Sequence, residues 1–396
     1  MSMSIQLLHC SDTHLGKNFN IPSAERRFRR SEDLEQAFAS AVEYALKNRP
    51  DIFLLTGDVF DRISPPNNER VFLTQMARQL RDASIPLFII GGNHDVPKTE
   101  PGPRERHLAI DVLETAGLAT VFSSSDEFQG RTLKIDGKDV RVEGKSYQAQ
   151  FEAQNPLAQG KPELGGGYNI LMLHASLKGL GVTPTEEIMA SQNPFRPEDI
   201  PKGTNLLALG HFHNSFVRQY RGCTIVNPGS MERMGWAEMV DEKGFAWIEL
   251  ERSEASVEFV KLETRPMGAT TITLSPEMKY EPSVTAFVVK RLVEMADEER
   301  MVKLLLRGRV TMEQYNQLKI GEILEACRDS FFHLVVDRSD LEVEGYGRIF
   351  AERVANPVEA YAKRLRTLIS RAQNDEERRR LEEILEIGNK YLEEIT

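Results

Sequence analysis

Short apolar runs alternate with longer amphipathic stretches through the first part of the chain. Four runs are rich in Ile, Leu, Val and Phe, and each leads directly into polar residues: 5–9, 52–56, 87–91 and 170–174. Runs of this length and composition are typical of buried strands. Between the first two runs, Leu34, Phe38, Ala41 and Ala45 recur at helical spacing. The alternation predicts an α/β domain whose strand ends carry the chemistry.

The pattern changes near residue 206, where five closely spaced strands are predicted: 206–209, 216–220, 224–227, 245–250 and 257–261. A segment with Pro and Gly, 263–268, then marks a boundary. A small mixed segment follows, with predicted strands at 269–273, 301–309 and 332–337 and predicted helices at 286–294 and 311–325. We therefore predict a first domain over 1–265 and a small α+β domain over 266–345.

Residues 346–396 are highly charged and are predicted to form a helical hairpin. Each helix carries an apolar stripe: Val358, Tyr361, Leu365, Leu368 and Ile369 on the first, and Leu381, Ile384, Leu385, Ile387, Tyr391 and Ile395 on the second. The pattern leaves two possibilities open. The stripes pack either on the chain's own domain or on a partner protein.

The composition narrows the class of protein. Of the 396 residues, 40% are hydrophobic and 28% are charged, which is a normal balance for a globular protein. A net charge of −10 argues against binding nucleic acid through bulk positive charge, although divalent cations among carboxylates would supply positive charge locally. We find no membrane span and no signal peptide, and three widely spaced cysteines predict no disulfide framework. We expect a cytoplasmic protein that binds no membrane.

Histidines and acidic residues gather directly after the predicted strands. Five sets stand there: Asp12 with His14, Asp58 with Asp61, Asn93 with His94 and Asp95, His174, and His211 with His213. A single histidine at a strand end is more often structural, and a lone Gly-Asp is usually a turn. Five sets together instead predict a metal centre, because carboxylate, imidazole and amide oxygen suit Mn²⁺, with Fe²⁺ or Zn²⁺ as alternatives.

These five motifs, in this order across residues 5–250, resemble those of the calcineurin-like metallophosphoesterases. The resemblance implies a β-sandwich flanked by helices and two divalent metal ions, with Mn²⁺ expected. It assigns one ion to Asp12, His14, Asp58 and His213, and the other to Asp58, Asn93, His174 and His211. It also implies that His94 protonates the oxygen that leaves the phosphate and that Asp95 orients His94.

Finer segments resemble the SbcD-type DNA repair exonucleases: 11–16, 57–61, 91–95, 229–233 and 242–245. This resemblance implies a 3′→5′ exonuclease on duplex DNA that also cuts single strands internally, acting in double-strand-break repair at the nucleoid. It implies a homodimer, a second domain that caps DNA ends, and docking of the C-terminal helices on an SbcC-type coiled-coil ATPase. Some members have a histidine where this chain has Asp61, so Asp61 is expected only to brace the site.

Two other functions stay open on the sequence alone. One is a phosphodiesterase of the same superfamily that acts on small nucleotides, and the other is a non-catalytic scaffold for the ATPase. A scaffold would be expected to lack a metal ligand or His94, and none of these residues is missing.

A cluster of arginines lies shortly after the first motif. Arg26, Arg27, Arg29 and Arg30 surround Phe28, a combination that suits phosphate binding and base stacking. The alternative is a solvated helix face, and the sequence does not separate the two. Cys10 precedes the first motif and is expected to be a small core residue rather than a ligand.

Overall fold

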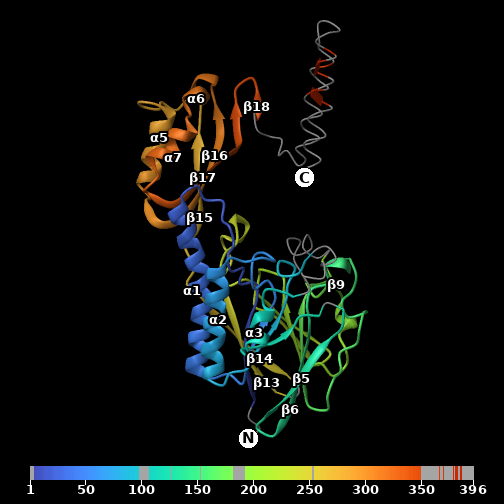
Figure 1. The fold of residues 1–396 in the computed structure, drawn as a ribbon. Coiled ribbons are helices and arrows are strands. Elements are labelled where there is room, and N and C mark those ends of the chain that lie inside the picture. Colours follow the sequence, from blue (N-terminus) through green and yellow to red (C-terminus); the bar gives the residue numbers. More distant parts are fainter. Residues whose placement is uncertain are drawn as a thin grey trace. The chain divides into compact units, whose positions relative to one another are not determined.

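The computed structural model describes residues 4–97, 107–124, 126–151, 153–181, 192–251 and 254–348, together with a few helical positions between 365 and 385. The chain divides into two compact units, the first formed by residues 1–268 with 299–301 and the second by the residues between and after them (Figure 1). Most of the predicted helical hairpin over 346–396 lies outside the described residues. Of its two apolar stripes, the structure describes only Leu365, Ile369, Leu381, Ile384 and Leu385, all of them helical.

The first unit contains two six-stranded sheets. One sheet has the order β14-β13-β1-β2-β3-β4 and consists of β14 (Ala255–Lys261), β13 (Gly244–Leu250), β1 (Ile5–Cys10), β2 (Ile52–Thr56), β3 (Leu87–Ile90) and β4 (Thr120–Phe122). Strands β1 to β4 run parallel, whereas β13 and β14 form an antiparallel extension.

The other sheet has the order β11-β12-β10-β7-β6-β5. Its strands are β11 (Phe216–Tyr220), β12 (Cys223–Asn227), β10 (Leu206–Gly210), β7 (Tyr168–His174), β6 (Lys138–Lys145) and β5 (Gln129–Ile135). Strands β6, β7, β10 and β12 run parallel. A separate pair, β8 (Ser176–Leu177) and β9 (Pro194–Phe195), follows β7.

The two sheets pack face to face. Their shared core is made of Ile and Leu from β1, β2 and β3 on one side and of apolar residues from β6, β7 and β10 on the other, among them Leu54, Ile90, Val142, Met172 and Ala208. Every residue of β2 and β7 is buried, which agrees with their nearly continuous apolar sequences. Because β2 and β7 are buried on both faces of their sheets, they lie at the centre of the sandwich.

Helices cover the outer face of the first sheet (Figure 1). Helix α1 (Ala24–Asn48) begins at Ser23, whose side chain accepts a hydrogen bond from the backbone of Arg26. Its Phe38 ring packs against Phe53 of β2, and α2 (Asn67–Asp82) lies beside it. A short helix, α3 (Asp111–Thr115), precedes β4. The predicted β-sandwich flanked by helices is confirmed.

The second unit is a four-stranded sheet with helices. The sheet has the order β15-β16-β17-β18, from β15 (Met267–Leu274), β16 (Asp297–Val310), β17 (Phe331–Val343) and β18 (Gly347–Arg348). Its core joins buried apolar residues of these strands to those of α5 (Val284–Val293) and α7 (Ile320–Ala326), such as Val288, Leu304 and Ile323.

One helix of this unit was predicted wrongly. Residues 311–325 form two helices, α6 (Met312–Gln317) and α7, separated by Leu318 in an extended conformation. The hydroxyl of Thr285 holds the break, because it donates to the carbonyl of Gln317 at 2.6 Å and accepts from the backbone N–H of Lys319 at 2.9 Å. A distant side chain thus replaces the hydrogen bonds that a continuous helix would make.

The carboxyl ends of the central strands of both sheets meet at one end of the sandwich. The hydroxyl of Thr56, the last residue of β2, donates to the carbonyl of Leu209 near the end of β10, at 2.9 Å. Side chains that follow β1, β2, β3, β7 and β10 therefore converge. Within the part of the chain that the structure describes, no helix combines the length and the apolar character that a membrane crossing requires.

Candidate metal centre

All seven predicted ligands come together at this end of the sandwich. Asp12 and His14 follow β1, Asp58 follows β2, and Asn93 follows β3 in the first sheet, whereas His174 ends β7, and His211 and His213 follow β10 in the second. Within each of three overlapping groups, the ligand atoms lie within 4.8 Å of one another: Asp12, His14 and His213; His14, Asp58 and His94; and Asp12, Asp58 and His174.

The distances separate the ligand atoms into two sets. In the first set, His14 Nε2 lies 3.2 Å from His213 Nε2 and 3.6 Å from Asp58 Oδ2. Asp12 Oδ1 lies 4.0 Å from His213 Nε2 and joins the same set. These four side chains form the predicted ligand set of one ion.

In the second set, the side-chain oxygen of Asn93 lies 3.0 Å from His174 Nε2 and 3.1 Å from His211 Nδ1. His174 Nε2 also lies 3.5 Å from Asp58 Oδ2, the atom that the first set contacts. Asp58 therefore stands between the two sets, where a carboxylate can bridge two cations.

Three of the histidines are held by their outer nitrogen. The Nδ1 atom of His14 lies 3.1 Å from an Asp61 carboxylate oxygen, that of His174 lies 2.9 Å from the carbonyl oxygen of Thr56, and that of His213 lies 2.8 Å from a Glu238 oxygen. Since each of these partners can only accept, Nδ1 carries the proton in all three rings. The Nε2 atoms are thereby directed into the centre, as in histidines that bind metals.

The centre holds more acceptors than the protein can satisfy. The Nε2 atoms of His14 and His213 face each other, and a carboxylate oxygen of Asp12 is buried without a hydrogen-bond partner. Buried acceptors of this kind require a proton or a cation beside them. The mixture of carboxylate, imidazole and amide donors suits borderline divalent cations, so the residues fit the metals that were predicted.

The backbone at the centre adopts conformations that side chains rarely permit. Asp12, His14, Asp58 and His211 have φ angles of 51°, 44°, 46° and 99°. A non-glycine residue in such a conformation costs about 1–3 kcal/mol and persists where the surrounding structure enforces it. Strained backbone at four candidate ligands indicates that the fold holds them for function rather than for stability.

Glycines allow two strand ends to approach the ligands. A Cβ atom on Gly92 would lie 2.2 Å from Asp58 Oδ1, and a Cβ atom on Gly210 would lie 2.0 Å from the carbonyl oxygen of Thr56. Neither neighbour can move freely, because Asp58 belongs to the centre and the Thr56 carbonyl orients His174. These two positions need glycine for close packing of the loops.

Charge is distributed unevenly over the centre. Burial would raise the pKa of Asp58, but His174, His14 and His94 hold it well below its ordinary value. Burial would lower the pKa of His174, but the charge and the hydrogen bond of Asp58 outweigh burial and raise it to about 9. His174 and Asp58 thus form a buried ion pair without metal, and a cation that binds here displaces a proton.

His94 lies at the exposed rim of the centre. Its side chain is 39% exposed, whereas those of His14 and His174 are buried. Its backbone N–H donates to Asp58 Oδ1 at 2.8 Å, and its ring lies edge-on to the ring of His14 with centroids 4.8 Å apart. His94 is thus more exposed than the candidate ligands that it adjoins.

The structure corrects the predicted role of Asp95. Its carboxylate does not contact His94 but accepts hydrogen bonds from the backbone N–H groups of Val59, Phe60 and Gly92, at 2.9 to 3.0 Å. Burial and the nearby charge of Asp58 raise the pKa of Asp95 to about 7. Asp95 ties the loop after β3 to the loop after β2, because its side chain points into the protein and away from the rim.

Asp61 takes the orienting role instead. Its backbone carbonyl accepts from His94 Nδ1 at 3.1 Å, and its carboxylate accepts from His14 Nδ1 and from Lys17 Nζ, at 3.1 and 3.0 Å. The expectation that Asp61 braces the site agrees with these contacts, and one residue thereby holds both the candidate ligand His14 and the rim residue His94.

The structure also corrects, in part, the prediction that the arginine cluster binds substrate. Arg30 is fully buried, pairs with Asp33 and Glu232, and lies over the ring of Phe19, so it cannot contact a substrate. The guanidinium of Arg27 donates to the carbonyls of Ile21 and Pro22, and that of Arg29 pairs with Glu299.

Two residues of the centre were not found from the sequence. Glu238, which orients His213, and Lys243, which contacts Glu238 at 2.7 Å, belong to no ligand motif. The carboxylate lies 25 positions after His213, in a short 3₁₀ turn at Trp236–Glu238, so spacing gives no signal for it. Cys10 is buried in the core, as expected.

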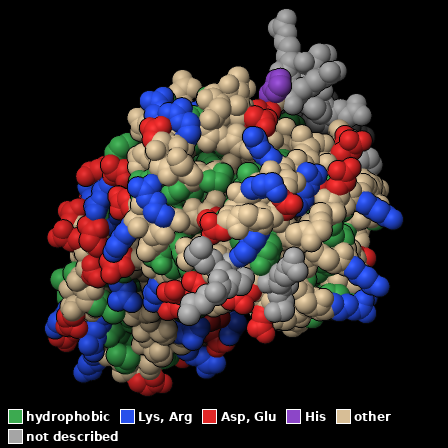
Figure 2. Space-filling view, turned by 90° about the horizontal axis from the view of Figure 1, so that it is seen from below, with side chains coloured by type: hydrophobic (Ala, Val, Ile, Leu, Met, Phe, Trp, Pro, Cys, Tyr) green, Lys and Arg blue, Asp and Glu red, His purple; other side chains and the backbone are tan. Residues whose placement is uncertain are grey.

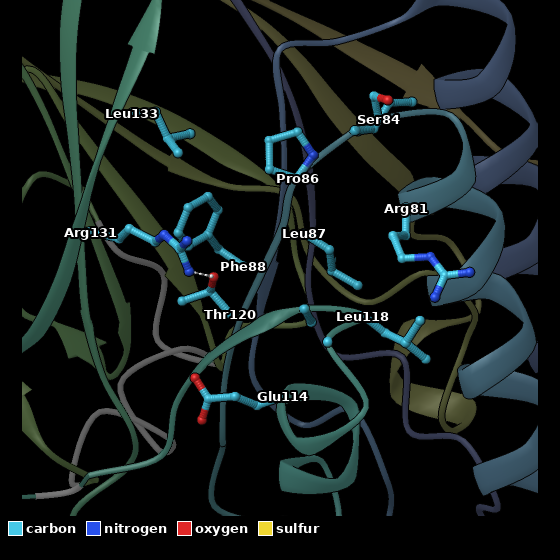
Figure 3. A pocket seen from close by; sticks show the side chains of 13 residues that line it. Arg81, Ser84, Pro86, Leu87, Phe88, Glu114, Leu118, Thr120, Arg131 and Leu133 are labelled. Carbon is cyan, nitrogen blue, oxygen red and sulfur yellow. Dashed lines mark hydrogen bonds between the residues drawn. The ribbon is translucent and has the colours of Figure 1, made fainter.

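The cavity drawn in Figure 3 does not belong to this centre. It has a volume of about 600 Å³ and is lined by apolar side chains such as Phe88, Leu118 and Leu133, with Arg131 at one side (Figure 3). Its residues include 85–88, at the start of β3, whereas Asn93 follows the end of that strand. The cavity therefore lies at the opposite end of β3 from the candidate ligands.

The fold and the centre together define the class of protein, a metal-dependent hydrolase of phosphoesters. Residues 5–215 match the family model described as calcineurin-like phosphoesterase, and the chain belongs to this family. Members of the family bind divalent metals, in agreement with the unsatisfied acceptors of the centre.

Some relatives have names that are more specific than the family's. The chain is 27% identical over 350 residues to the DNA double-strand break repair protein Mre11 of Sulfolobus acidocaldarius. The matched region covers 85% of this chain and 83% of that protein. It is 29% identical to the protein of the same name from Sulfurisphaera tokodaii, over 67% of this chain and 65% of that protein. It is 27% identical to the uncharacterized metallophosphoesterase YhaO of Bacillus subtilis, over 66% of this chain and 62% of that protein. The chain thus spans less than two thirds of the last two relatives.

Proposed function

We propose that the protein is a DNA nuclease that hydrolyses phosphodiester bonds with two divalent metal ions, and that these ions are Mn²⁺. The observation that carries the proposal is the pair of ligand sets that share Asp58, with His94 at the exposed rim beside them. The relatives named as DNA double-strand break repair proteins support DNA as the substrate.

The residues divide the work in the following way. Asp12, His14, Asp58 and His213 would hold one ion, and Asp58, Asn93, His174 and His211 the other. When bound, such ions polarise phosphate oxygens and lower the pKa of a water molecule that attacks the phosphorus. His94 is placed to give a proton to the leaving oxygen, and the Asp61 carbonyl fixes its ring by accepting from Nδ1.

Bound metals would also explain how a protein with a net charge of −10 binds DNA. Figure 2 shows Lys and Arg side chains interspersed with Asp and Glu over the face that it draws. With a formal charge of −10, attraction of DNA would depend on local positive charge, which two divalent cations would provide at the centre. Arg26 and the exposed Phe28 stay candidates for contacts with DNA.

A homodimer through helices of the first unit forms part of the proposal. Val71 of α2 and Val112 of α3 are 55% and 51% exposed, and Ile63, in the loop before α2, is 46% exposed. Large apolar side chains that are this exposed on neighbouring helices suit an interface between two copies. The proposal also predicts 3′→5′ exonuclease activity on duplex DNA and endonuclease activity on single strands. It predicts that the second unit caps DNA ends. It further predicts that residues 346–396 dock on an SbcC-like ATPase in double-strand-break repair.

A comparison of two substrates tests the proposal. The metal-stripped protein would be supplied with Mn²⁺ and assayed for nucleotide release from linear duplex DNA and for hydrolysis of bis-p-nitrophenyl phosphate. Release of nucleotides that depends on Mn²⁺ supports the nuclease. Efficient turnover of the small diester with no cleavage of DNA would favour the small-nucleotide phosphodiesterase, and no turnover of either would favour the scaffold.

A further inference from the structure

Glu238 contacts the metal ligand His213 from outside the predicted ligand sets. One of its oxygens accepts from His213 Nδ1 at 2.8 Å. The other oxygen lies 2.7 Å from Lys243 Nζ and accepts from the backbone N–H of Met234 at 3.1 Å. Both oxygens are therefore engaged, and one of them is directed at the ligand.

Lys243 is an unusual partner because it is completely buried. Its ammonium group donates to the carbonyl oxygen of His213 at 3.0 Å and to the hydroxyl of Ser230 at 2.9 Å, besides its contact with Glu238. Burial of an ammonium group costs free energy unless an opposite charge and hydrogen bonds offset the loss of hydration. The group holds the backbone of His213 and the carboxylate that orients its ring, so it acts on the same residue twice.

The chain offers a comparison for this pair a few residues away. Glu242 and Lys261 also form a Glu–Lys ion pair, at 2.6 Å, but their side chains are 65% and 61% exposed, and neither touches a metal ligand. An exposed pair of this kind contributes little to stability. The difference between the two pairs is burial and the contact with His213, which points to a role at the centre.

We propose that Glu238, held by Lys243, is a positioning residue that keeps the His213 ring directed at the metal it shares with Asp12, His14 and Asp58. The contact fixes the tautomer with a proton on Nδ1 and a lone pair on Nε2. It acts on one of the two metals, since neither Glu238 nor Lys243 has a described contact with Asn93, His174 or His211. The inference rests on the two-metal centre of the proposed function.

Metal binding is the direct test. The full chain would be prepared as Glu238→Ala, Glu238→Gln and the control Glu242→Gln, stripped of metal and titrated with Mn²⁺ by calorimetry, with bound manganese counted after desalting. We expect Glu238→Ala to weaken one of the two binding steps by about 10–100-fold and to leave the other step unchanged. Glu238→Gln should lose less, because its amide oxygen can still accept from His213, and Glu242→Gln should match the natural protein.

The same variants separate positioning from catalysis. At saturating Mn²⁺, turnover of bis-p-nitrophenyl phosphate by Glu238→Gln should return to within a few-fold of the natural protein. A loss that persists at saturation would show that Glu238 acts on the reacting groups. Unchanged Mn²⁺ affinity in a folded Glu238→Ala variant, or equal weakening of both steps, would overturn the inference. If Glu238→Ala does not fold, Glu238→Gln decides by the same criteria, because its amide keeps a partner for Lys243.

These measurements do not involve DNA. A natural protein that binds two Mn²⁺ ions and cleaves the small diester, but not DNA, would overturn the nuclease proposal and leave the role of Glu238 intact. A natural protein that binds fewer than two ions would overturn the two-metal centre itself.

Discussion

At the scale of single residues, His94 and the ligands differ in exposure and therefore in expected role. His94 is half-exposed at the rim, and the contacts that the structure describes for it are with Asp61, Asp58 and His14. The candidate ligands are mostly buried, and the Nε2 atoms of His14, His174 and His213 face inward. Substitutions at the two kinds of position should separate metal binding from chemistry.

We expect His94→Ala to retain both Mn²⁺ ions but to lose cleavage by about 10²–10⁴-fold, the usual contribution of a general acid. The loss is measured as turnover at saturating Mn²⁺, with bound metal counted in parallel. His107→Ala is the matched control, because His107 is an exposed histidine whose described partner is Asp111. Cleavage by His94→Ala at the natural rate would remove His94 from the mechanism. Asp58→Ala should instead lose metal, since both ligand sets contain Asp58.

The ion pair of His174 and Asp58 predicts two opposite effects of pH. Asp58 raises the pKa of His174 to about 9, against about 6.5 in an unfolded chain. Without metal, the pair therefore stabilises the fold fully below about pH 6.5, and this stability is lost as the pH rises through 9. With metal, a cation must displace the His174 proton, so Mn²⁺ affinity should rise with pH over the same range.

Both trends can be measured on one protein. Unfolding by denaturant without metal gives the first, and Mn²⁺ titration at several pH values gives the second. Affinity that is flat or falls between about pH 6.5 and 9 would contradict the assignment of His174 as a ligand that is protonated without metal.

At the scale of elements, most strands were predictable and some were not. β2 and β11 have the predicted bounds, because their apolar or alternating patterns end in polar residues or a turn. The β5–β6 hairpin was not predicted, since β5 lies at the sheet edge, is mostly exposed and has a largely polar sequence. The single helix expected over 311–325 failed because apolar spacing does not reveal that Thr285 breaks it.

The break between α6 and α7 predicts the effect of a nearly isosteric substitution. Thr285 is 7% exposed and satisfies the carbonyl of Gln317 and the N–H of Lys319. Thr285→Val should therefore destabilise the second unit by about 1–3 kcal/mol, the cost of leaving buried polar groups unsatisfied. Thr273→Val, at an exposed position of β15, is the control for the loss of a hydroxyl group. Equal stability of the two variants in denaturant unfolding would contradict the role of Thr285.

At the scale of the whole molecule, the two compact units predict unequal responses to metal. The predicted ligands all belong to the first unit, and the second unit has its own apolar core. Each bound Mn²⁺ ion should stabilise the first unit by about 2.7 kcal/mol at a free concentration 100 times its dissociation constant. In calorimetry, the thermal transition of the first unit should move upward with Mn²⁺, and that of the second should stay in place. Asp58→Ala should abolish the movement.

The sequence by itself predicted that the candidate ligands lie together, because each stands at the end of an apolar run and strand ends of a sheet share one edge. It also determined the α/β class, through the alternation of apolar runs with amphipathic stretches. These features depend on neighbours along the chain, which a linear pattern records.

Only the tertiary structure decided which groups orient the ligands. Asp61 rather than Asp95 holds His94, Glu238 holds His213, and the Thr56 carbonyl holds His174. It also decided that Arg30 is a buried ion-pair partner rather than a contact for substrate. The physical reason is that a hydrogen bond depends on distance and direction in space. Residues 25 to 118 positions apart satisfy that requirement here without any regular spacing that a sequence could display.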